Sequence, residues 1–407
     1  MSIAPSLSAP QARANINLYY AYTFFGNAAF WLSIHVVYFQ SRGLSLSEIM
    51  WLLSAQSVSQ ALLEVPSGVF SDRFGRRRTL TIAAACKVLF CVLCMVEASL
   101  PVYLLGAACL GAHIAFESGT DAALVFETLS VLDRTKDYTK VKGRSFAFRM
   151  LGNGVGAIAG GYLAAADYVL PWALAAACCV IALALTLLLH EPGRTREIHH
   201  VSARTVISTG LQSLRSNRRL LRLLLLSATV VACILTGLRY QQPYLAQAGI
   251  VLERFGPVYL LWLLTSMAAA MSIGRWGPRL DERVFFFGLP ALLGLQYLLL
   301  ARWVGPEGIA IMLIGQAVIG IARPMYTTYI NQEVDGASRA TVLSVSGFVQ
   351  NLLLLVLAPI VGWVGDLWSL STAFVALAAV VVIGGSSLSL MLLWSSAPRE
   401  VEPTPSP

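Results

Sequence analysis

The sequence predicts an all-α membrane protein with twelve transmembrane helices, on three observations. First, 57% of its 407 residues are apolar and only 12% are charged, whereas soluble domains carry about 25% charged residues. Second, about 20 apolar residues cross a bilayer, and about twelve such segments fit along the chain. Third, of the 29 Lys and Arg residues only Arg42, Arg254 and Arg302 fall in loops on one side. The positive-inside rule therefore places both termini in the cytoplasm, and we expect an integral protein of the plasma (inner) membrane without a cleaved signal peptide.

The first six spans make up an N-terminal bundle, residues 1–190. Their apolar runs cover residues 16–40, 46–69, 79–98, 102–132 and 146–166, with a sixth run that ends at residue 190. Residues 191–219 form a basic cytoplasmic central loop. Its Val206, Ile207, Leu211 and Leu214 recur at helical spacing, so the loop either lies on the inner leaflet or is a flexible linker. The adjacent His199 and His200 have no nearby Cys or carboxylate cluster, so we expect no metal site.

The second half repeats the plan of the first. Spans at 220–246 and 255–273 are followed by two that end near residue 332 and two that end near residue 394, which gives a C-terminal bundle over residues 220–396. Gly277 and Asp281 follow the eighth span as Gly68 and Asp72 follow the second. These echoes predict two pseudo-symmetric six-helix bundles. The polar tail, residues 397–407, is expected to be disordered.

The loop GVFSDRFGRRRTL, residues 68–80, lies between the second and third spans. On charge alone it is an ordinary basic loop. The order of its Gly, Asp, Arg and Leu residues, however, resembles the signature between helices 2 and 3 of the major facilitator superfamily. The resemblance covers the whole chain and implies two bundles that rock about a central cavity. It also implies a conformational latch formed by Gly68, Asp72, Arg73, Gly75, Arg76 and Arg77.

That latch is expected to close in the outward-facing state. Asp72 would then accept hydrogen bonds from the N-terminus of the eleventh helix, near Gly336 and Ser338, where the helix dipole favours an anion. Arg73 and Arg76 would pair with acidic groups nearby.

The fifth span contains the run GNGVGAIAGG. Its glycines at every fourth position allow another helix to approach closely, and packing alone explains them. The run also resembles the helix 5 signature of the drug/proton antiporter branch. Ala157 replaces the proline of that signature, and Ala107 stands where the antiporters carry an arginine in helix 4, so proton coupling would need other residues. The packing glycines are Gly152, Gly156, Gly160 and Gly161.

Polar side chains concentrate in the first, fourth, seventh and tenth spans. An ionisable group in hydrocarbon costs at least ~2.5 kcal/mol on the insertion scale, so it usually faces a partner or a water-filled cavity. The resemblance implies that these four helices line the central cavity. An interhelical hydrogen bond is the alternative role for any single residue, and for Arg239 a pair with an acid of the first half. The expected cavity residues are Asn27, His35, Arg239, Gln242, Gln316, Arg323 and Tyr326.

His113, Glu117 and Asp121 are spaced i, i+4, i+8, which predicts one stripe along the fourth helix. Burial and a neighbouring carboxylate both raise the proton affinity of an acid. The three residues are therefore our candidates for proton coupling. The alternative is a structural ion pair with Lys87 or Arg149.

Together these features predict a secondary active transporter that exports a small organic compound by proton-coupled alternating access. The alternative is an importer or facilitator of a small anionic or zwitterionic metabolite, since Arg239 and Arg323 suit such a group. An enzyme is not expected, because the chain has no HExxH, GxSxG or paired catalytic set. We expect a monomer in membrane lipid whose partners are a small-molecule substrate and protons, with no cofactor, no metal and no nucleic acid.

Overall fold

The computed structural model describes residues 7–96, 99–192, 217–277, 280–334 and 339–394. These residues form helices and connecting turns, with no strand among them. The first half contains α1 (Ala9–Gly26), α2 (His35–Ser41), α3 (Leu46–Phe74), α4 (Arg76–Met95), α5 (Leu100–Glu117), α6 (Thr120–Val131), η1 (Thr135–Asp137), α7 (Tyr138–Ala166) and α8 (Leu170–Leu188). The second half contains α10 (Arg218–Gln247), η2 (Leu252–Arg254), α11 (Phe255–Trp276), α12 (Glu282–Arg302), α13 (Gly308–Gln332), α14 (Arg339–Leu367), α15 (Leu370–Ala379), η4 (Val380–Gly384, a π-helical turn) and α16 (Gly385–Trp394).

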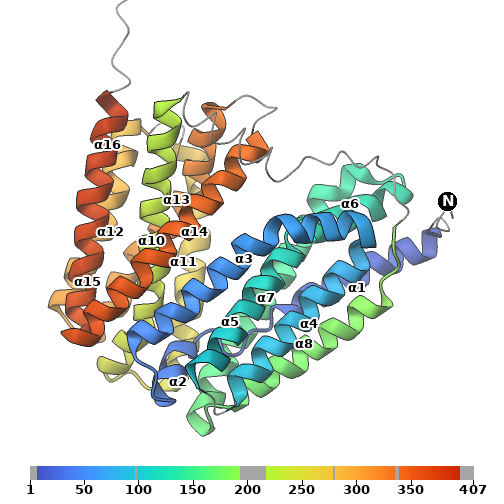
Figure 1. The fold of residues 1–407 in the computed structure, drawn as a ribbon, viewed down its shortest axis with the longest axis horizontal. Helices are drawn as coiled ribbons and strands as arrows, with labels where there is room; N and C mark the ends of the chain where they lie inside the picture. Colours follow the sequence, from blue (N-terminus) through green and yellow to red (C-terminus); the bar gives the residue numbers. More distant parts are fainter. Residues whose placement is uncertain (1–6, 97–98, 193–216, 278–279, 335–338, 395–407) are drawn as a thin grey trace, which may run out of the picture.

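The helices of each half pack mainly with one another, and the halves meet where α3 crosses α14 and where α7 lies against α11 (Figure 1). Among the described residues, nine segments are long and apolar enough to cross a membrane. Three predicted spans are not among these nine: the pair of helices α1 and α2, the helix α3, and the helix α7. The last two of these are 29-residue helices that carry several charged side chains.

The first predicted span is not one helix over residues 16–40. It begins earlier, at Ala9, ends at Gly26 and resumes only at His35. The intervening backbone lies against the glycine face of α7, where a Cβ on Gly156 would be only 2.8 Å from the Ala29 nitrogen. Side chains satisfy part of the freed backbone: Gln242 of α10 donates to the Leu32 carbonyl at 3.0 Å and accepts from the Val36 nitrogen at 2.7 Å. The interruption is thus stabilised by tertiary contacts that the sequence pattern does not reveal.

The fourth predicted span is also interrupted. α5 ends at Glu117 and α6 begins at Thr120, because Gly119 adopts a φ of 72°, a left-handed conformation that glycine tolerates and a helix interior does not. A further difference is that α7 begins at Tyr138 rather than near residue 146, so part of the expected basic loop is helical.

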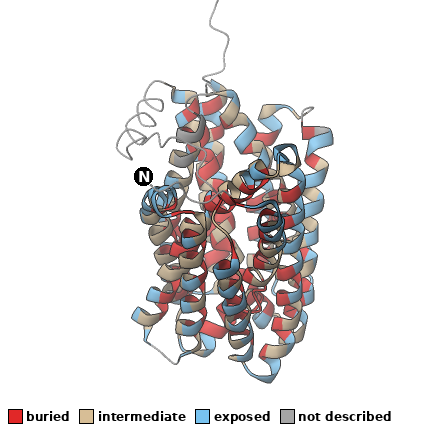
Figure 2. Cartoon of the chain, turned by 90° about the vertical axis from the view of Figure 1, so that its right-hand side faces the viewer, coloured by how far each residue is buried: buried red, intermediate tan, exposed pale blue. Residues whose placement is uncertain are grey.

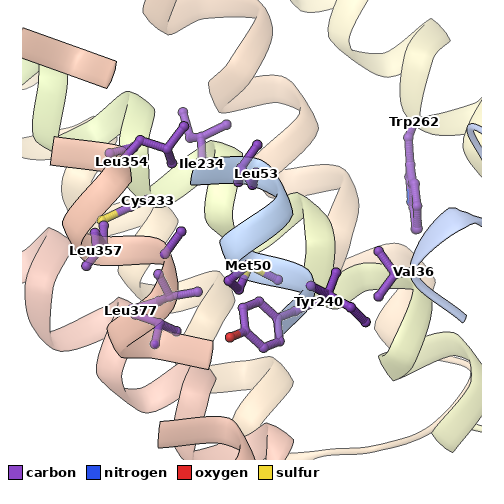
Figure 3. Packing of buried hydrophobic residues seen from close by; sticks show 14 of the residues in the cluster. Val36, Met50, Leu53, Cys233, Ile234, Tyr240, Trp262, Leu354, Leu357 and Leu377 are labelled. Carbon is purple, nitrogen blue, oxygen red and sulfur yellow. The ribbon is translucent and has the colours of Figure 1, made fainter. Parts of the chain in front are cut away.

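Buried side chains run through the middle of the helices and the exposed ones cover the outside (Figure 2). One large apolar cluster joins the halves, since Met50 and Leu53 of α3 pack among Tyr240 of α10 and Leu354 and Leu357 of α14 (Figure 3). A smaller cluster around Tyr19 and Tyr22 belongs to the first half alone.

The hydrogen bonds that the described residues make between the halves lie at one end of the molecule. Among the described residues, every such bond uses residues 32–54 of the first half. At this closed end Asp366 of α14 accepts from the backbone nitrogens of Leu46 and Ser47, each at 2.8 Å. Towards the opposite, open end, where α6 lies in the first half and α16 ends in the second, the two groups of helices diverge (Figure 1).

Candidate functional site

A pocket of about 240 Å³ lies between the halves, close to the closed end. Its walls come from the segment before α2 and from α10, α11 and α13. The residues that line it include Leu32, Ser33, His35, Arg239, Gln241, Gln242, Tyr259, Trp262, Ser266 and Gln316. The pocket therefore contains residues that are far apart in the sequence and belong to both halves.

Among the described residues that line the pocket, Arg239 is the one charged side chain, apart from any charge on His35. Its guanidinium donates to the His35 Nε2 atom across the boundary between the halves. No carboxylate in the described part of the chain lies within ion-pair distance of it. Arg239 thus has unused donors in a largely apolar setting.

Gln242 lies one helical turn from Arg239 and binds the backbone of the first half in two places. Because the His35 Nε2 atom accepts from Arg239, the Nδ1 atom carries the proton and donates to the Leu32 carbonyl at 3.0 Å. In α13, the Gln316 amide nitrogen lies 3.4 Å from the Gln241 oxygen. Four of the seven predicted cavity residues, His35, Arg239, Gln242 and Gln316, therefore meet at one pocket.

The other three predicted cavity residues do not line it. Asn27 donates to the Thr23 carbonyl at 2.8 Å, within its own segment. Tyr326 is buried against Phe285, with ring centroids 5.2 Å apart. Arg323 is exposed and belongs to no described ion pair.

A second, smaller hollow of about 40 Å³ shares His35 and Arg239 with the pocket. Its remaining walls are mostly apolar and aromatic, and Trp31 and Trp172 stack there at 5.5 Å with an interplanar angle of 10°. This space is enough for about one to three waters.

The acidic residues of α5 and α6 form a separate cluster inside the first half. Glu117 accepts from the Tyr22 hydroxyl at 3.0 Å and lies 3.7 Å from His113 and 4.0 Å from Arg149. The His113 Nδ1 atom lies 2.9 Å from the Ala83 carbonyl oxygen.

The helix break at Gly119 separates Asp121 from His113 and Glu117, so the three residues do not form the predicted continuous stripe. Asp121 therefore has different partners. It accepts from the Tyr19 hydroxyl at 2.9 Å and from the Lys142 ammonium at 2.7 Å. Lys87 is buried but makes no described ion pair with either acid. Neither acid lines the pocket that contains Arg239.

The predicted 68–80 loop is helical on both sides of Gly75, because α3 continues to Phe74 and α4 begins at Arg76. In this segment Arg76 binds Asp72 at 2.7 Å and Glu127 of α6 at 3.0 Å, so both contacts stay within the first half. Gly75 has a φ of 101° and forms the turn between α3 and α4. The Arg73 guanidinium lies 5.4 Å from the Phe74 ring centroid. Gly336 and Ser338, the expected partners of Asp72, lie outside the described residues, as do His199 and His200.

The four glycines of α7 lie at close backbone contacts. A Cβ on Gly152 would meet the Phe24 carbonyl oxygen at 2.5 Å, and Gly156 and Gly160 face the backbone of residues 29 and 30. Gly161 faces the second half, where a Cβ would meet the Leu252 carbonyl oxygen at 2.5 Å.

Sequence reasoning missed four residues with distinct roles. The Glu191 carboxylate accepts from the backbone nitrogens of Arg76 and Arg77 at 2.6 and 2.9 Å and so caps α4. Tyr259 lines the pocket, and Asp366 joins the halves. Glu64 is an exposed acid within α3 with no described partner. The apolar sequence around Glu64 could have revealed it, whereas the contacts of the other three depend on tertiary structure.

No group of three or more His, Cys, Asp or Glu residues in the described ranges has a geometry that could hold a metal ion.

Comparisons with known proteins agree with this architecture. Residues 16–356 match the family model of the Major Facilitator Superfamily. An uncharacterised MFS-type transporter of Bacillus subtilis (strain 168), YxaM, is 22% identical over 360 residues, which cover 86% of this chain and 88% of the relative.

Solved structures show the same fold at low sequence identity. The nucleoside transporter NupG superposes with a TM-score of 0.78 at 13% identity, covering 95% of this chain and all of that one. A D-xylose–proton symporter superposes with a TM-score of 0.67 at 14% identity, covering 96% and 98%. The chain therefore belongs to the Major Facilitator Superfamily and is an integral membrane transporter, not an enzyme.

Proposed function

We propose that the protein moves a small organic anion or zwitterion across the plasma (inner) membrane by alternating access. In this proposal twelve spans form two six-helix bundles, residues 1–190 and 220–396, which rock about the pocket. Both termini and the basic 68–80 loop lie in the cytoplasm. The open end is then cytoplasmic, and the conformation described above is the inward-facing one.

The single observation that carries the substrate class is Arg239 without a carboxylate partner. A guanidinium in an apolar pocket is costly unless an anion pairs with it, and its fork of donors matches a carboxylate or phosphate. His35 alone leaves most of those donors unused. An anionic group of the substrate would complete the pairing.

For coupling, we propose that Glu117, with His113 beside it and Asp121 nearby, binds and releases the coupling proton. Support comes from the environment of Glu117, which is enclosed by Tyr22, His113 and Arg149 at a helix break. Discontinuous helices are common at the ion sites of transporters. We propose export as the direction, on the glycine run of α7 that resembles the antiporter signature.

The second candidate is an importer or facilitator without proton coupling. The ion pairs of the acids favour it, since Asp121 pairs with Lys142 and Glu117 lies near Arg149. A carboxylate that pairs with a cation is held in its charged form and exchanges protons less readily.

The experiment has two steps. First, the purified protein is screened for thermal stabilisation by carboxylates, amino acids, sugars and cationic drugs, because any ligand of the native state raises its melting temperature. The hits are then tested on Arg239→Gln, with Arg323→Gln as the matched control of equal charge. Loss of a charge-assisted hydrogen bond, about 1.5–3 kcal/mol, should weaken anion binding about 10- to 100-fold in the first variant only.

The second step measures transport of the best hit in liposomes with an imposed pH gradient. If the substrate moves away from the side that corresponds to the cytoplasm, and this movement depends on the pH gradient, the result supports the proton-coupled exporter. Transport that ignores the gradient supports the second candidate. Anion binding that is equal in both arginine variants would refute the proposed substrate site.

A further inference from the structure

The hydrogen-bond donors and acceptors that line the 240 Å³ pocket define the substrate class more closely than a negative charge alone does. Most of the side-chain acceptors that line the pocket are already engaged. The His35 Nε2 atom accepts from Arg239, so the Nδ1 atom carries the ring proton and donates to the Leu32 carbonyl at 3.0 Å. The Gln242 oxygen accepts from the Val36 nitrogen, and the Gln241 oxygen faces the Gln316 amide.

The donors, by contrast, remain in surplus. Arg239 has five N–H groups and uses one partner. The Tyr259 hydroxyl makes no described hydrogen bond, and it is close enough to interact electrostatically with Arg239. Among the described lining residues, free acceptor capacity is limited to the Gln316 oxygen and the hydroxyl oxygens of Ser33, Tyr259 and Ser266. A matching ligand must therefore supply acceptors and few donors.

The rest of the pocket wall is apolar. Seven of the fifteen lining residues are aliphatic or aromatic hydrocarbons or indole: Leu32, Leu238, Leu245, Phe255, Trp262, Leu263 and Ile319. None of the lining residues in the described part of the chain is Asp or Glu, so no carboxylate among them would balance a cation. The volume is below the ~300–1,000 Å³ of most drug-binding pockets, which favours a ligand of about a dozen non-hydrogen atoms.

We infer that the pocket selects a compact, mostly apolar organic acid, such as an aromatic or branched carboxylate, and that Tyr259 is the second donor to its carboxylate. This inference rests on the proposed function, because it takes the pocket around Arg239 as the substrate site. It excludes polyhydroxylated substrates, since a sugar needs paired donors and acceptors along its whole surface. It also excludes cationic drugs, whose charge would lie unpaired beside Arg239.

The test compares five small probes on the purified full-length protein: 4-methylbenzoate, 4-methylbenzamide, 4-methylbenzylammonium, ribose and gluconate. Dissociation constants are measured by calorimetry, with melting temperature as a second readout. The benzoate is expected to bind at least tenfold more tightly than the isosteric amide. The ammonium ion and ribose are expected not to bind.

Two tyrosine variants then assign the second donor. Tyr259→Phe should weaken benzoate binding about fivefold, the value of one hydrogen bond, without changing the weak binding of the amide. Tyr162→Phe is the matched control, because Tyr162 is 57% exposed on α7 and does not line the pocket.

The outcomes separate this inference from the proposed function. If a polyhydroxylated acid such as gluconate binds as tightly as the benzoate, or if Tyr259→Phe changes nothing, the inference is wrong. In both cases dependence of binding on Arg239 would leave the proposed function intact. If ribose or the ammonium ion binds best and Arg239→Gln has no effect, the proposed substrate site fails as well.

Discussion

Glu117 and Asp121 each contact a tyrosine hydroxyl and a cationic side chain of α7, but their distances to the cationic group differ. Asp121 has its Lys142 partner at 2.7 Å, whereas the nearest cationic atom of Arg149 is 4.0 Å from Glu117. Glu117 therefore lies in the more loosely paired site of the two, which makes it the first acid to test as the proposed proton carrier.

Glu117→Gln is therefore expected to remove most proton-driven accumulation. It should leave equilibrium binding of the substrate within about twofold, because Glu117 does not line the pocket. Proton-driven counterflow in liposomes measures the first quantity and calorimetry the second. Asp137→Asn is the control, since Asp137 pairs with Arg134 near the open end. Full coupling in both Glu117→Gln and Asp121→Asn would assign the cluster a structural role.

At the scale of single residues, the sequence predicts that a buried polar side chain has a partner, but not the direction in which that side chain points. A polar residue in a span shows that some partner exists, and His35, Arg239, Gln242 and Gln316 do converge. It does not show how the helix is rotated. Tyr326 consequently faces Phe285 within the second half instead of the pocket. Tyr259 was missed because an aromatic residue in an apolar helix carries no signal of its own.

At the scale of elements, α3 and α14 hold the closed end together. The Asp366 carboxylate caps the N-terminus of α3 through Leu46 and Ser47, where the helix dipole favours an anion. Gly362 permits this contact, since a Cβ there would lie 2.7 Å from the Ser47 Cα atom.

Asp366→Ala should destabilise the closed end and shift the protein towards the opposite conformation. Loss of a helix cap costs ~1 kcal/mol, which corresponds to about a fivefold change in the ratio of the two conformations. Accessibility of a cysteine placed at Met50, which is buried between α3 and α14 in this conformation, to a membrane-impermeant thiol reagent should rise accordingly. Asp167→Ala is the control, because Asp167 also bonds a backbone nitrogen near a helix start but within the first half. Unchanged accessibility would mean that Asp366 does not control this end.

The glycine face of α7 gives a third prediction. Gly160→Leu should lower the melting temperature, because the new side chain would collide with the backbone at Phe30 and overpacking costs about 1–3 kcal/mol. Gly143→Ala in the same helix has no atom within 4 Å of the added Cβ and should be nearly neutral. Equal melting temperatures for the two variants would contradict the close contact.

Helix existence was predictable from apolar length, but the interruptions were not. The break before α2 depends on the glycines of α7 and on Gln242 of α10, which are distant in sequence. The break at Gly119 had a local signal in its glycine. That signal is weak because many glycines remain helical, as Gly152, Gly156 and Gly160 do.

At the scale of the whole molecule, Asp72 and Asp366 suggest a reciprocal arrangement. Asp366 at the end of α14 binds the start of α3 at the closed end. We propose that Asp72, near the end of α3, binds the start of the eleventh span when the open end closes. Asp72→Asn should then shift the population inward and slow transport. An unaltered rate with an unaltered conformational distribution would count against this latch.

The account depends most on the claim that the two ends open in alternation around one pocket. Spin labels at Gln40 and Ser369 report the closed end, and labels at Lys136 and Arg283 report the open end, in a background that lacks the seven native cysteines. Pulsed electron paramagnetic resonance should show that the distance at the closed end lengthens while the distance at the open end shortens, when conditions favour the opposite conformation. If both distances lengthen together, or if neither responds to substrate or pH, alternating access as described here is contradicted.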